Sequence, residues 1–296
     1  MSRLRDAARL LLYFAAALLA GALLAPPLFW GGQWLVQHGF AVWLAKYDFE
    51  TFFHRALLVA VLVLLWPLLR SLKVKSRHDL GLQPNRTWRR DTLVGFLIAG
   101  SPLLFGAQLI LQLGWYKFRG LVAAGPLLAV IASSIIVPLI EEALFRGLIL
   151  GVLLRAGGTR TAIVISAAIF SVLHFLKAPE HTTIAPTWTS GLTSIGHAFT
   201  QFADPMLLAA SFTTLFLLGL IMADARVRTR SLWCPIGLHA GWILVNGVFN
   251  KLAHREVLAL PWLGRNLLVG IIPLCIALIS WGALHLWLNH DREKLP

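Results

Sequence analysis

Charged residues are scarce in this chain of 296 residues: Asp, Glu, Lys and Arg together make up 13% of it. A typical soluble domain contains about 25% charged residues, because its surface must be hydrated. Apolar residue types make up 58% of the chain, and the mean hydropathy is +0.74. This composition excludes a soluble globular enzyme and a disordered protein, and it predicts an integral membrane protein.

Cysteine is nearly absent too. Cys234 and Cys275 lie in separate apolar stretches without C-x-x-C spacing, which disfavours a disulfide framework or a cysteine metal site. The N-terminal apolar run lacks the small-residue cleavage site of a secretory signal and ends in Pro26-Pro27 and large aromatic residues. We therefore expect this run to remain in the protein as its first membrane span.

Long apolar segments are abundant. A membrane span needs about 20 predominantly apolar residues, and eight segments meet or approach that length. They lie near 8–30, 55–72, 92–114, 121–154, 161–176, 206–223, 232–249 and 266–288. The fourth is too long for one straight crossing, and Gly125-Pro126 and Pro138 predict that it starts late, tilts or breaks.

The basic residues indicate the orientation of these segments. With the N-terminus inside, 17 of the 26 basic residues fall in inner segments and eight in outer ones. Basic residues accumulate in cytoplasmic loops, so we predict an all-α polytopic membrane bundle of about eight transmembrane helices with both termini cytoplasmic. One membrane domain is expected over 1–296, with an N-terminal three-helix part (1–119), a central core (120–250), and a last helix with a cytoplasmic tail (251–296).

Three charged residues lie inside the fourth segment, although most of the acidic residues fall in loops or at span ends. These are Glu141, Glu142 and Arg146, and each costs at least about 2.5–3.5 kcal/mol on insertion scales. Glu142 and Arg146 stand four residues apart and can pair on one helix face. Glu141 points about 100° away, so a purely structural ion pair leaves it unexplained. A carboxyl in a water-filled pocket is what general acid–base catalysis requires.

Two histidines in other segments offer partners for these carboxyls. His174 lies four residues after Phe170 in the fifth segment, and His239 lies in the seventh. Each, taken alone, is equally compatible with a hydrogen-bonded packing residue. The order E-E-x-x-x-R, F-x-x-x-H and then G-L-H-A-G-W resembles the CPBP family of intramembrane proteases, the CAAX-protease and bacteriocin-processing family, over about residues 120–250.

One position departs from this family pattern. The third motif usually carries an amide or an acid four residues after its histidine, where this chain has Ile243. Asn246 lies seven residues after His239, near the same helix face. Asn246 either supplies the missing amide one turn along or plays no part in the site, and Phe170 is a further candidate.

The resemblance implies hydrolysis of a peptide bond within or beside the bilayer. It implies that Glu141, helped by His174, activates a water molecule, that His239 stabilises the oxyanion, and that Glu142 and Arg146 form a supporting ion pair. No cofactor is expected. The alternative is Zn²⁺ held by Glu141, His174 and His239, although H-E-x-x-H is absent. The expected partners are the bilayer and a membrane-embedded or lipidated protein or peptide substrate, with no nucleic acid, in a bacterial inner membrane.

Other functions remain open at this point. No G-x-S-x-G and no mid-span Asp occur, which argues against serine and aspartyl intramembrane proteases. A non-catalytic membrane factor, for example in bacteriocin self-immunity, is compatible with Ile243. A proton-coupled transporter is compatible with intramembrane Glu and His, but the paired broken helices of inverted repeats are not seen.

Overall fold

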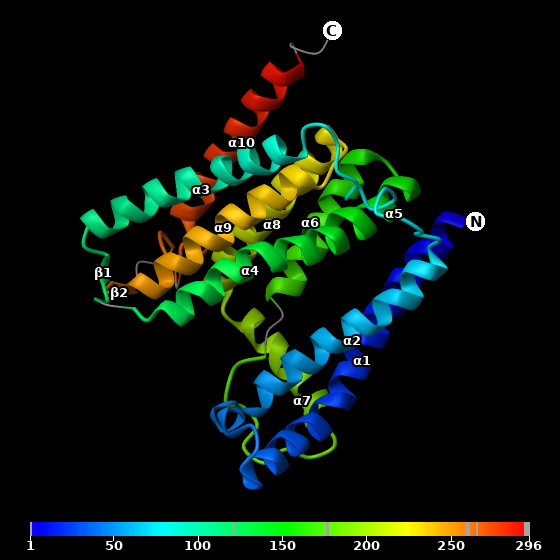
Figure 1. The fold of residues 1–296 in the computed structure, drawn as a ribbon, viewed down its shortest axis with the longest axis vertical. Coiled ribbons are helices and arrows are strands. Elements are labelled where there is room, and N and C mark those ends of the chain that lie inside the picture. Colours follow the sequence, from blue (N-terminus) through cyan, green and yellow to red (C-terminus); the bar gives the residue numbers. More distant parts are fainter. Residues whose placement is uncertain (1, 121, 176–177, 258–260, 265, 293–296) are drawn as a thin grey trace. The chain divides into compact units, whose positions relative to one another are not determined.

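The computed structural model describes residues 2–120, 122–175, 178–257, 261–264 and 266–292, and most of them are helical (Figure 1). The tail residues 293–296 lie outside the described residues. The α-helices are α1 (Ser2–Gln37), α2 (Phe49–Ser71), α3 (Trp88–Gln112), α4 (Ala124–Glu142), α5 (Leu150–Ala156), α6 (Thr159–Phe175), α7 (Ser190–Ala198), α8 (Pro205–Thr229), α9 (Trp233–Leu252) and α10 (Ile271–Arg292). Short 3₁₀ helices cover Val42–Lys46 and Phe199–Ala203.

The predicted all-α membrane fold is confirmed. Six helical stretches among the described residues are long and apolar enough to cross a membrane: Arg5–Gln37, Phe49–Ser71, Trp88–Gln112, Ala124–Ala156, Leu208–Thr229 and Ile271–His290. The other two predicted segments correspond to α6, which is shorter at 17 residues, and to α9, which carries His239 and two asparagines. The count of eight spans and the cytoplasmic placement of the termini stay predictions.

Proline did not interrupt the helices where the sequence suggested it. The stretch Ala124–Ala156 is helical throughout and passes through Pro138, while Pro126 lies in its first turn, where proline is well tolerated. The irregular part lies further on, where Ala143–Ile149 forms a π-helix directly after Glu142. Such π segments are frequent at functional sites. The first helix likewise runs through Pro26 and Pro27 to Gln37, beyond its predicted end.

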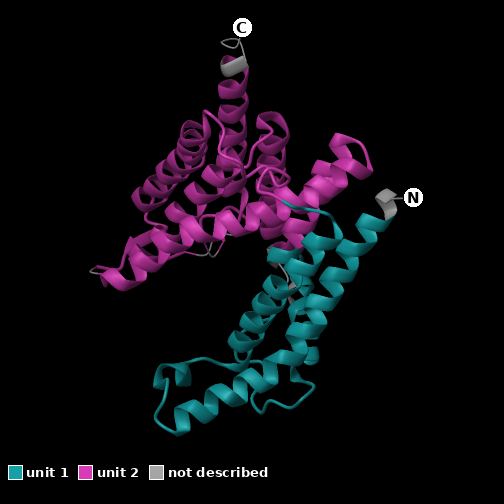
Figure 2. Ribbon diagram, turned by 45° about the vertical axis from the view of Figure 1, so that its right-hand side comes forward, with its two compact units in different colours: residues 1–75, 173–205 teal, residues 76–172, 206–296 magenta. Residues whose placement is uncertain are grey.

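The chain forms two compact units, which are coloured separately in Figure 2. Unit 1 comprises residues 1–75 and 173–205, and unit 2 comprises residues 76–172 and 206–296. In unit 1, α1, α2 and α7 pack around a core that includes Ala22, Phe49, Phe53 and Ala198. Gly191 of α7 lies so close to the Ala22 carbonyl oxygen that a Cβ there would collide with it.

The segment that contains His181 and Thr182 is bound to the start of α2. Asp48 caps this helix by accepting from the Thr51 N–H at 3.0 Å, and it also accepts from the His181 N–H at 2.7 Å. Glu50 is fully buried and accepts from the Thr182 hydroxyl at 2.7 Å. Burial by itself raises the pKa of Asp48, but the hydrogen bonds from Thr51 and His181 outweigh it and lower the pKa below its usual value. The burial of Glu50 was not expected from its place at a span end.

In unit 2, α3 and α9 approach each other closely through glycine. A Cβ added at Gly237 or Gly241 of α9 would collide with the carbonyl oxygen of Thr92 or of Phe96, and one added at Gly95 would collide with that of Cys234. This Gly237-x-x-x-Gly241 spacing allows backbones to approach in membrane helix pairs. Because one face of α9 is fixed on α3, its other side chains have a defined direction toward α4, with which α9 also packs.

The two strands are small additions to the all-α fold. The strands β1 (Tyr116–Phe118) and β2 (Ala253–Arg255) pair antiparallel, where α3 and α9 end. The Lys117 ammonium lies 3.1 Å from Glu256 Oε2, and this hydrogen bond and charge lower the pKa of Glu256. Three residues per strand are too few to give a recognisable alternation in the sequence.

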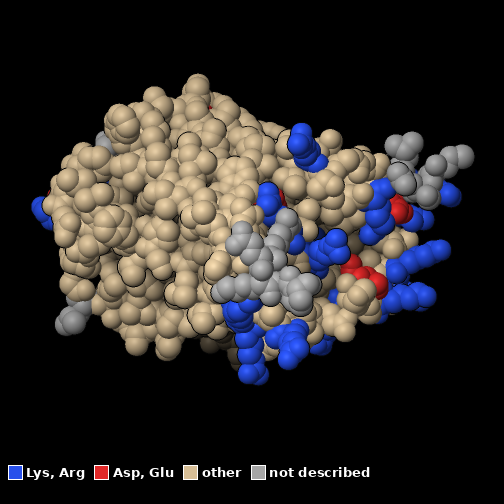
Figure 3. Space-filling view, turned by 90° about the horizontal axis from the view of Figure 1, so that it is seen from above, with Lys and Arg blue, Asp and Glu red and all other residues tan. Residues whose placement is uncertain are grey.

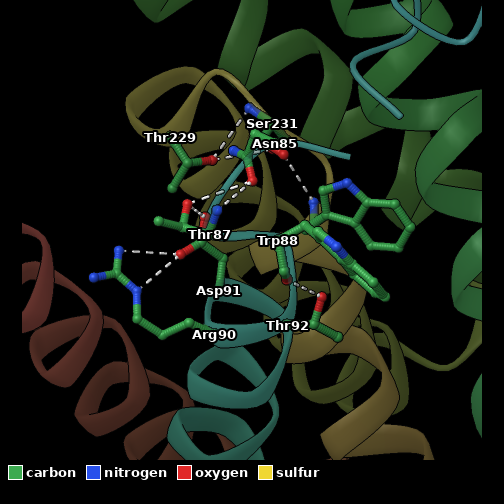
Figure 4. Close-up of polar contacts among 9 residues, drawn as sticks. Asn85, Thr87, Trp88, Arg90, Asp91, Thr92, Thr229 and Ser231 are labelled. Atoms are coloured by element: carbon green, nitrogen blue, oxygen red, sulfur yellow. Dashed lines mark hydrogen bonds and ion pairs between the residues drawn. The ribbon is translucent and has the colours of Figure 1, made fainter. Parts of the chain in front are cut away.

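The linker before α3 holds the turn that begins α9. The backbone N–H of Leu232 donates to the Gly81 carbonyl at 3.0 Å, and Trp233 Nε1 donates to that of Gln83 at 3.3 Å. Figure 4 shows the polar contacts around this turn, including Thr87 donating to Asp91 at 3.0 Å. In the view of Figure 3, Lys and Arg side chains gather together and most of the remaining surface carries no charge.

Candidate active site

A buried ion pair lies at the junction of α4 and the π-helix. Arg146 Nη1 lies 3.0 Å from Glu142 Oε1, and both side chains are completely inaccessible. Arg146 Nη2 also donates to the carbonyl oxygen of Gly219 on α8, at 3.3 Å. The pairing predicted from the spacing of four residues is therefore confirmed, and its guanidinium also links α4 to α8.

His239 of α9 lies between the two glutamates. Its Nδ1 is 2.8 Å from Glu142 Oε1, and its Nε2 is 3.8 Å from Glu141 Oε2. Because Oε1 of Glu142 thus bonds both His239 and Arg146, one carboxylate oxygen fixes two side chains from different helices. When Nδ1 donates to this carboxylate, the other nitrogen of the imidazole is directed toward Glu141.

Aromatic rings line this arrangement. The Arg146 guanidinium carbon lies 4.3 Å from the ring centre of Phe170 on α6, and the Phe170 and His239 rings meet edge-on at 6.1 Å. Phe145 packs edge-on against Phe170 at 5.1 Å. These rings exclude water from the ion pair and lower the local dielectric constant. The electrostatic attraction between Glu142 and Arg146 is therefore stronger than it would be in water.

Glu141 differs from Glu142 in accessibility. The Glu141 side chain is 27% exposed, whereas Glu142 is not exposed and His239 is 9% exposed. Glu141 Oε2 and His239 Nε2 are 3.8 Å apart, so a water oxygen placed about 2.8 Å from one of these atoms can also lie within hydrogen-bond distance of the other. The geometry thus provides a carboxylate and an imidazole that can share one water molecule.

Comparison with known proteins identifies this part of the chain. The family described as type II CAAX prenyl endopeptidase Rce1-like matches residues 123–245. Residues 123–245 are thus similar to this family of endopeptidases. The resemblance expected from the three motifs is thereby confirmed over that segment. Neither the curated proteins nor the solved structures gave a match to the chain.

The Rce1-like segment contains Glu141, Glu142, Arg146, Phe170, His174 and His239. The structure joins four of these, Glu142, Arg146, Phe170 and His239, by direct contacts, with Glu141 next to His239. His174 lies in the last turn of α6, one turn after Phe170, and is exposed. It falls within the part of the chain counted with unit 1, and its assistance to Glu141 stays a prediction.

Asn246 lies just outside the Rce1-like segment and has other partners. Its side-chain oxygen accepts from Asn250 Nδ2 and from the backbone N–H of Leu267, both at 3.2 Å. The amide thus holds the segment before α10 against α9. Its proposed contribution to the oxyanion site has no support in these contacts.

Two residues that shape the candidate active site were not predicted from the sequence. The carbonyl group of Gly219 receives Arg146, and Gly237 sets the distance between α9 and α3 two residues before His239. The spacing of Gly237 and Gly241 was visible in G-L-H-A-G. Nothing in the sequence pointed to Gly219, because a backbone acceptor has no residue signature.

The zinc alternative requires several ligand side chains around one position. Among the residues that the structure describes, no group of three or more His, Cys, Asp or Glu side chains is placed to hold a metal ion. Glu141 and His239 lie 3.8 Å apart, and Glu142 and His239 lie 2.8 Å apart. Zinc sites use at least three protein ligands, and the expectation that no cofactor is needed stays a prediction.

Proposed function

We propose that the protein is an intramembrane endopeptidase that hydrolyses a peptide bond of a membrane-associated or lipid-anchored protein or peptide. The observation that carries this proposal is His239 held between Glu142 and Glu141, at 2.8 and 3.8 Å. A structural ion pair requires Glu142 and Arg146 only, whereas this arrangement directs a second carboxylate and an imidazole nitrogen toward accessible space. The Rce1-like match over residues 123–245 supports the same reaction class.

In the proposed reaction, Glu141 is the general base. It takes a proton from a water molecule that attacks the scissile carbonyl carbon, and a tetrahedral oxyanion forms. Glu141 then gives this proton to the leaving amine as the C–N bond breaks. A positioned acid–base group of this kind contributes typically about 10²–10⁴-fold to the rate. His174 is proposed to assist Glu141 in orienting the water.

His239 is proposed to stabilise the oxyanion as an imidazolium. With Nδ1 donating to Glu142, a protonated Nε2 is left to donate to the developing negative charge. Glu141, Glu142, Arg146 and His239 then carry two negative and two positive charges, so the cluster is neutral in its low-dielectric surroundings. A donor fixed before the reaction stabilises charge without reorganisation.

The substrate is proposed to enter from the bilayer, since Glu141, Glu142 and Arg146 lie on the helical stretch Ala124–Ala156, which is apolar enough to span it. The family description names prenyl endopeptidases, and we therefore propose a lipidated C-terminal segment as the first substrate to test. Zinc is not proposed to take part. Chelation of the purified enzyme is expected to leave turnover unchanged, and elemental analysis is expected to find no stoichiometric zinc.

The decisive experiment compares Glu141→Gln with wild type in proteoliposomes, using quenched fluorescent peptides with and without a C-terminal farnesyl group. The variant is expected to lose product formation by at least about 100-fold while keeping its helical content. Glu256→Gln, the same chemical change outside the spans, is the matched control and is expected to retain full activity. Peptides that remain bound to Glu141→Gln are then identified by mass spectrometry to determine the natural substrate.

Two results would contradict the proposal. A Glu141→Gln protein that retained its cellular effect, such as bacteriocin self-immunity, would indicate a non-catalytic factor. If wild type cleaved no peptide but showed a proton-dependent uptake that Glu141→Gln lost, the protein would be a carrier.

A further inference from the structure

Two adjoining cavities lie between α1 and α2 of unit 1, and no residue of the candidate active site lines them. One is apolar, has a volume of about 230 Å³, and is lined mainly by Leu12, Tyr13, Leu64, Pro67 and Leu68. The other is polar and has a volume of about 340 Å³. Both cavities are lined by Arg9 and Ser71, so they form one continuous site.

The apolar cavity is a groove along the two helices. Its lining residues on α1 are 9, 12, 13 and 16, and those on α2 are 64, 67, 68 and 71. Both sets follow the spacing of one helix face. In each set the first and last residues are seven positions apart, which is about 10 Å along the helix axis, or about two thirds of one leaflet of hydrocarbon. The groove therefore has the length and the direction of a lipid chain lying beside a span.

The floor and walls of the groove explain why it stays open. Tyr13 is buried and its hydroxyl donates to the Val61 carbonyl at 2.9 Å, which holds the ring against α2. Ala16 offers only a methyl group to the groove, and Pro67, which lies inside α2, has a small, rigid ring and no backbone N–H to donate. These small or constrained residues leave space that larger side chains would fill.

The polar cavity carries an excess of positive charge. Arg5, Arg9 and Lys73 line it together with a single acid, Asp6. Asp6 lies 2.9 Å from Arg9 Nη1, which also donates to the Ser71 carbonyl at 3.0 Å. Among the described residues, Arg5 and Lys73 have no ion-pair partner. Lys73 is brought here by a left-handed backbone conformation, with φ of 58°, directly after α2 ends.

We infer that this site binds one anionic phospholipid, with its phosphate between Arg5, Arg9 and Lys73 and one acyl chain in the groove. A zwitterionic headgroup would leave two positive charges uncompensated, and a soluble phosphate would leave the groove empty. Basic pockets between membrane helices, joined to an apolar surface, are the general form of an anionic lipid site. The lipid joins α1 to the end of α2 and stabilises unit 1.

The test uses the full chain, purified in detergent with phosphatidylglycerol or with phosphatidylcholine of the same acyl chains, and counts retained lipid by native mass spectrometry. Phosphatidylglycerol is expected to remain as one bound copy and phosphatidylcholine to be lost. Equal retention of the two lipids would overturn the inference, and this comparison needs no variant to fold.

Two variants separate the headgroup from the chain. Replacing Arg5, Arg9 and Lys73 by Gln is expected to weaken phosphatidylglycerol binding by about fivefold for each charge removed. Ala16→Phe fills the groove and is expected to weaken binding with all charges present, whereas Ala16→Ser is expected to bind as wild type. An Ala16→Phe protein that bound normally would overturn the placement of the acyl chain.

A control triple of Arg86→Gln, Arg89→Gln and Arg155→Gln removes the same charge from unit 2. This control variant is expected to retain the bound lipid. If both triple variants weakened phosphatidylglycerol binding equally, the lipid would be attracted by the overall basic charge of the protein and not by this site. Displacement of the lipid by inorganic phosphate alone would likewise overturn the inference in favour of a soluble anion site.

Discussion

His239 Nδ1 lies 2.8 Å from Glu142 Oε1, and this contact joins α9 to α4 across 97 residues of sequence. The same oxygen atom receives Arg146 at 3.0 Å, while Oε2 of Glu142 has no hydrogen-bond partner among the described residues. Glu142 is therefore the common acceptor on which the positions of two cationic side chains depend. Its removal should affect folding as well as chemistry.

Removing the Glu142 carboxylate alone should destabilise the protein. Glu142→Ala leaves Arg146 buried without its counter-charge, and breaking a buried pair from one side costs about 3–5 kcal/mol. The double variant Glu142→Ala/Arg146→Met should lose less stability than the sum of the single variants. Unfolding in mixed micelles by increasing SDS, followed by circular dichroism, measures both. Additive losses would contradict a coupled pair.

Arginine at position 146 should not be replaceable by lysine. Its two terminal nitrogens reach different acceptors, Glu142 Oε1 and the Gly219 carbonyl, and its plane lies over Phe170. Lysine keeps the positive charge but has one terminal nitrogen in place of the planar guanidinium group with its two terminal nitrogens. Arg146→Lys is expected to lower the free energy of unfolding by about 1.5–3 kcal/mol, the value of a hydrogen bond to a charged group. The same unfolding assay detects this, and an unchanged midpoint would contradict it.

The glycines between α3 and α9 should differ sharply in their tolerance of a methyl group. Gly237→Ala brings Cβ into the Thr92 carbonyl oxygen, and the helices must separate. Overpacking of this kind costs typically about 1–3 kcal/mol, and a displaced His239 should lower the turnover rate as well. Gly100→Ala on α3 is the matched control, because its Cβ would have its nearest neighbour at 3.6 Å, an ordinary contact. Equal effects of the two substitutions on stability and turnover would contradict the crossing geometry.

The stabilisation that Asp48 provides through its hydrogen bond with the His181 N–H should decrease in acid. Because its pKa is lowered in the folded protein, its charged form stabilises the fold fully above its usual value of about 4. That contribution is lost as the pH falls through the lowered pKa. The melting temperature of wild type should therefore exceed that of Asp48→Asn at pH 6, and the difference should shrink below about pH 4. A difference that stayed constant down to pH 2 would contradict this.

The architecture and the ion pair could be predicted because each has a signature in one dimension. Apolar runs predicted the spans, and a spacing of four residues predicted the pairing of Glu142 with Arg146, as found. The order of three motifs identified the family over residues 123–245. These features depend on local periodicity and residue type, which a sequence displays directly.

Other features depend on tertiary contacts. The bond from His239 to Glu142 rather than only to Glu141, and the use of the Gly219 carbonyl, follow from how α4, α8 and α9 pack. The fourth segment was predicted to start late, tilt or break. Its helix begins at Ala124 and passes through Pro138 without a break, because proline costs one hydrogen bond and can be accommodated in a span. Glu50 was assigned to a span end, yet unit 1 covers it completely.

The ion pair also constrains how the protein is made. The stretch Ala124–Ala156 carries Glu141, Glu142 and Arg146 and enters the membrane before α8 and α9 have been synthesised. Until then, Arg146 has no Gly219 carbonyl and Glu142 has no His239, so this helix carries polar groups that lipid cannot satisfy. We therefore expect the helix to gain these partners only when α8 and α9 pack against it, and the candidate active site to be completed at that stage of folding.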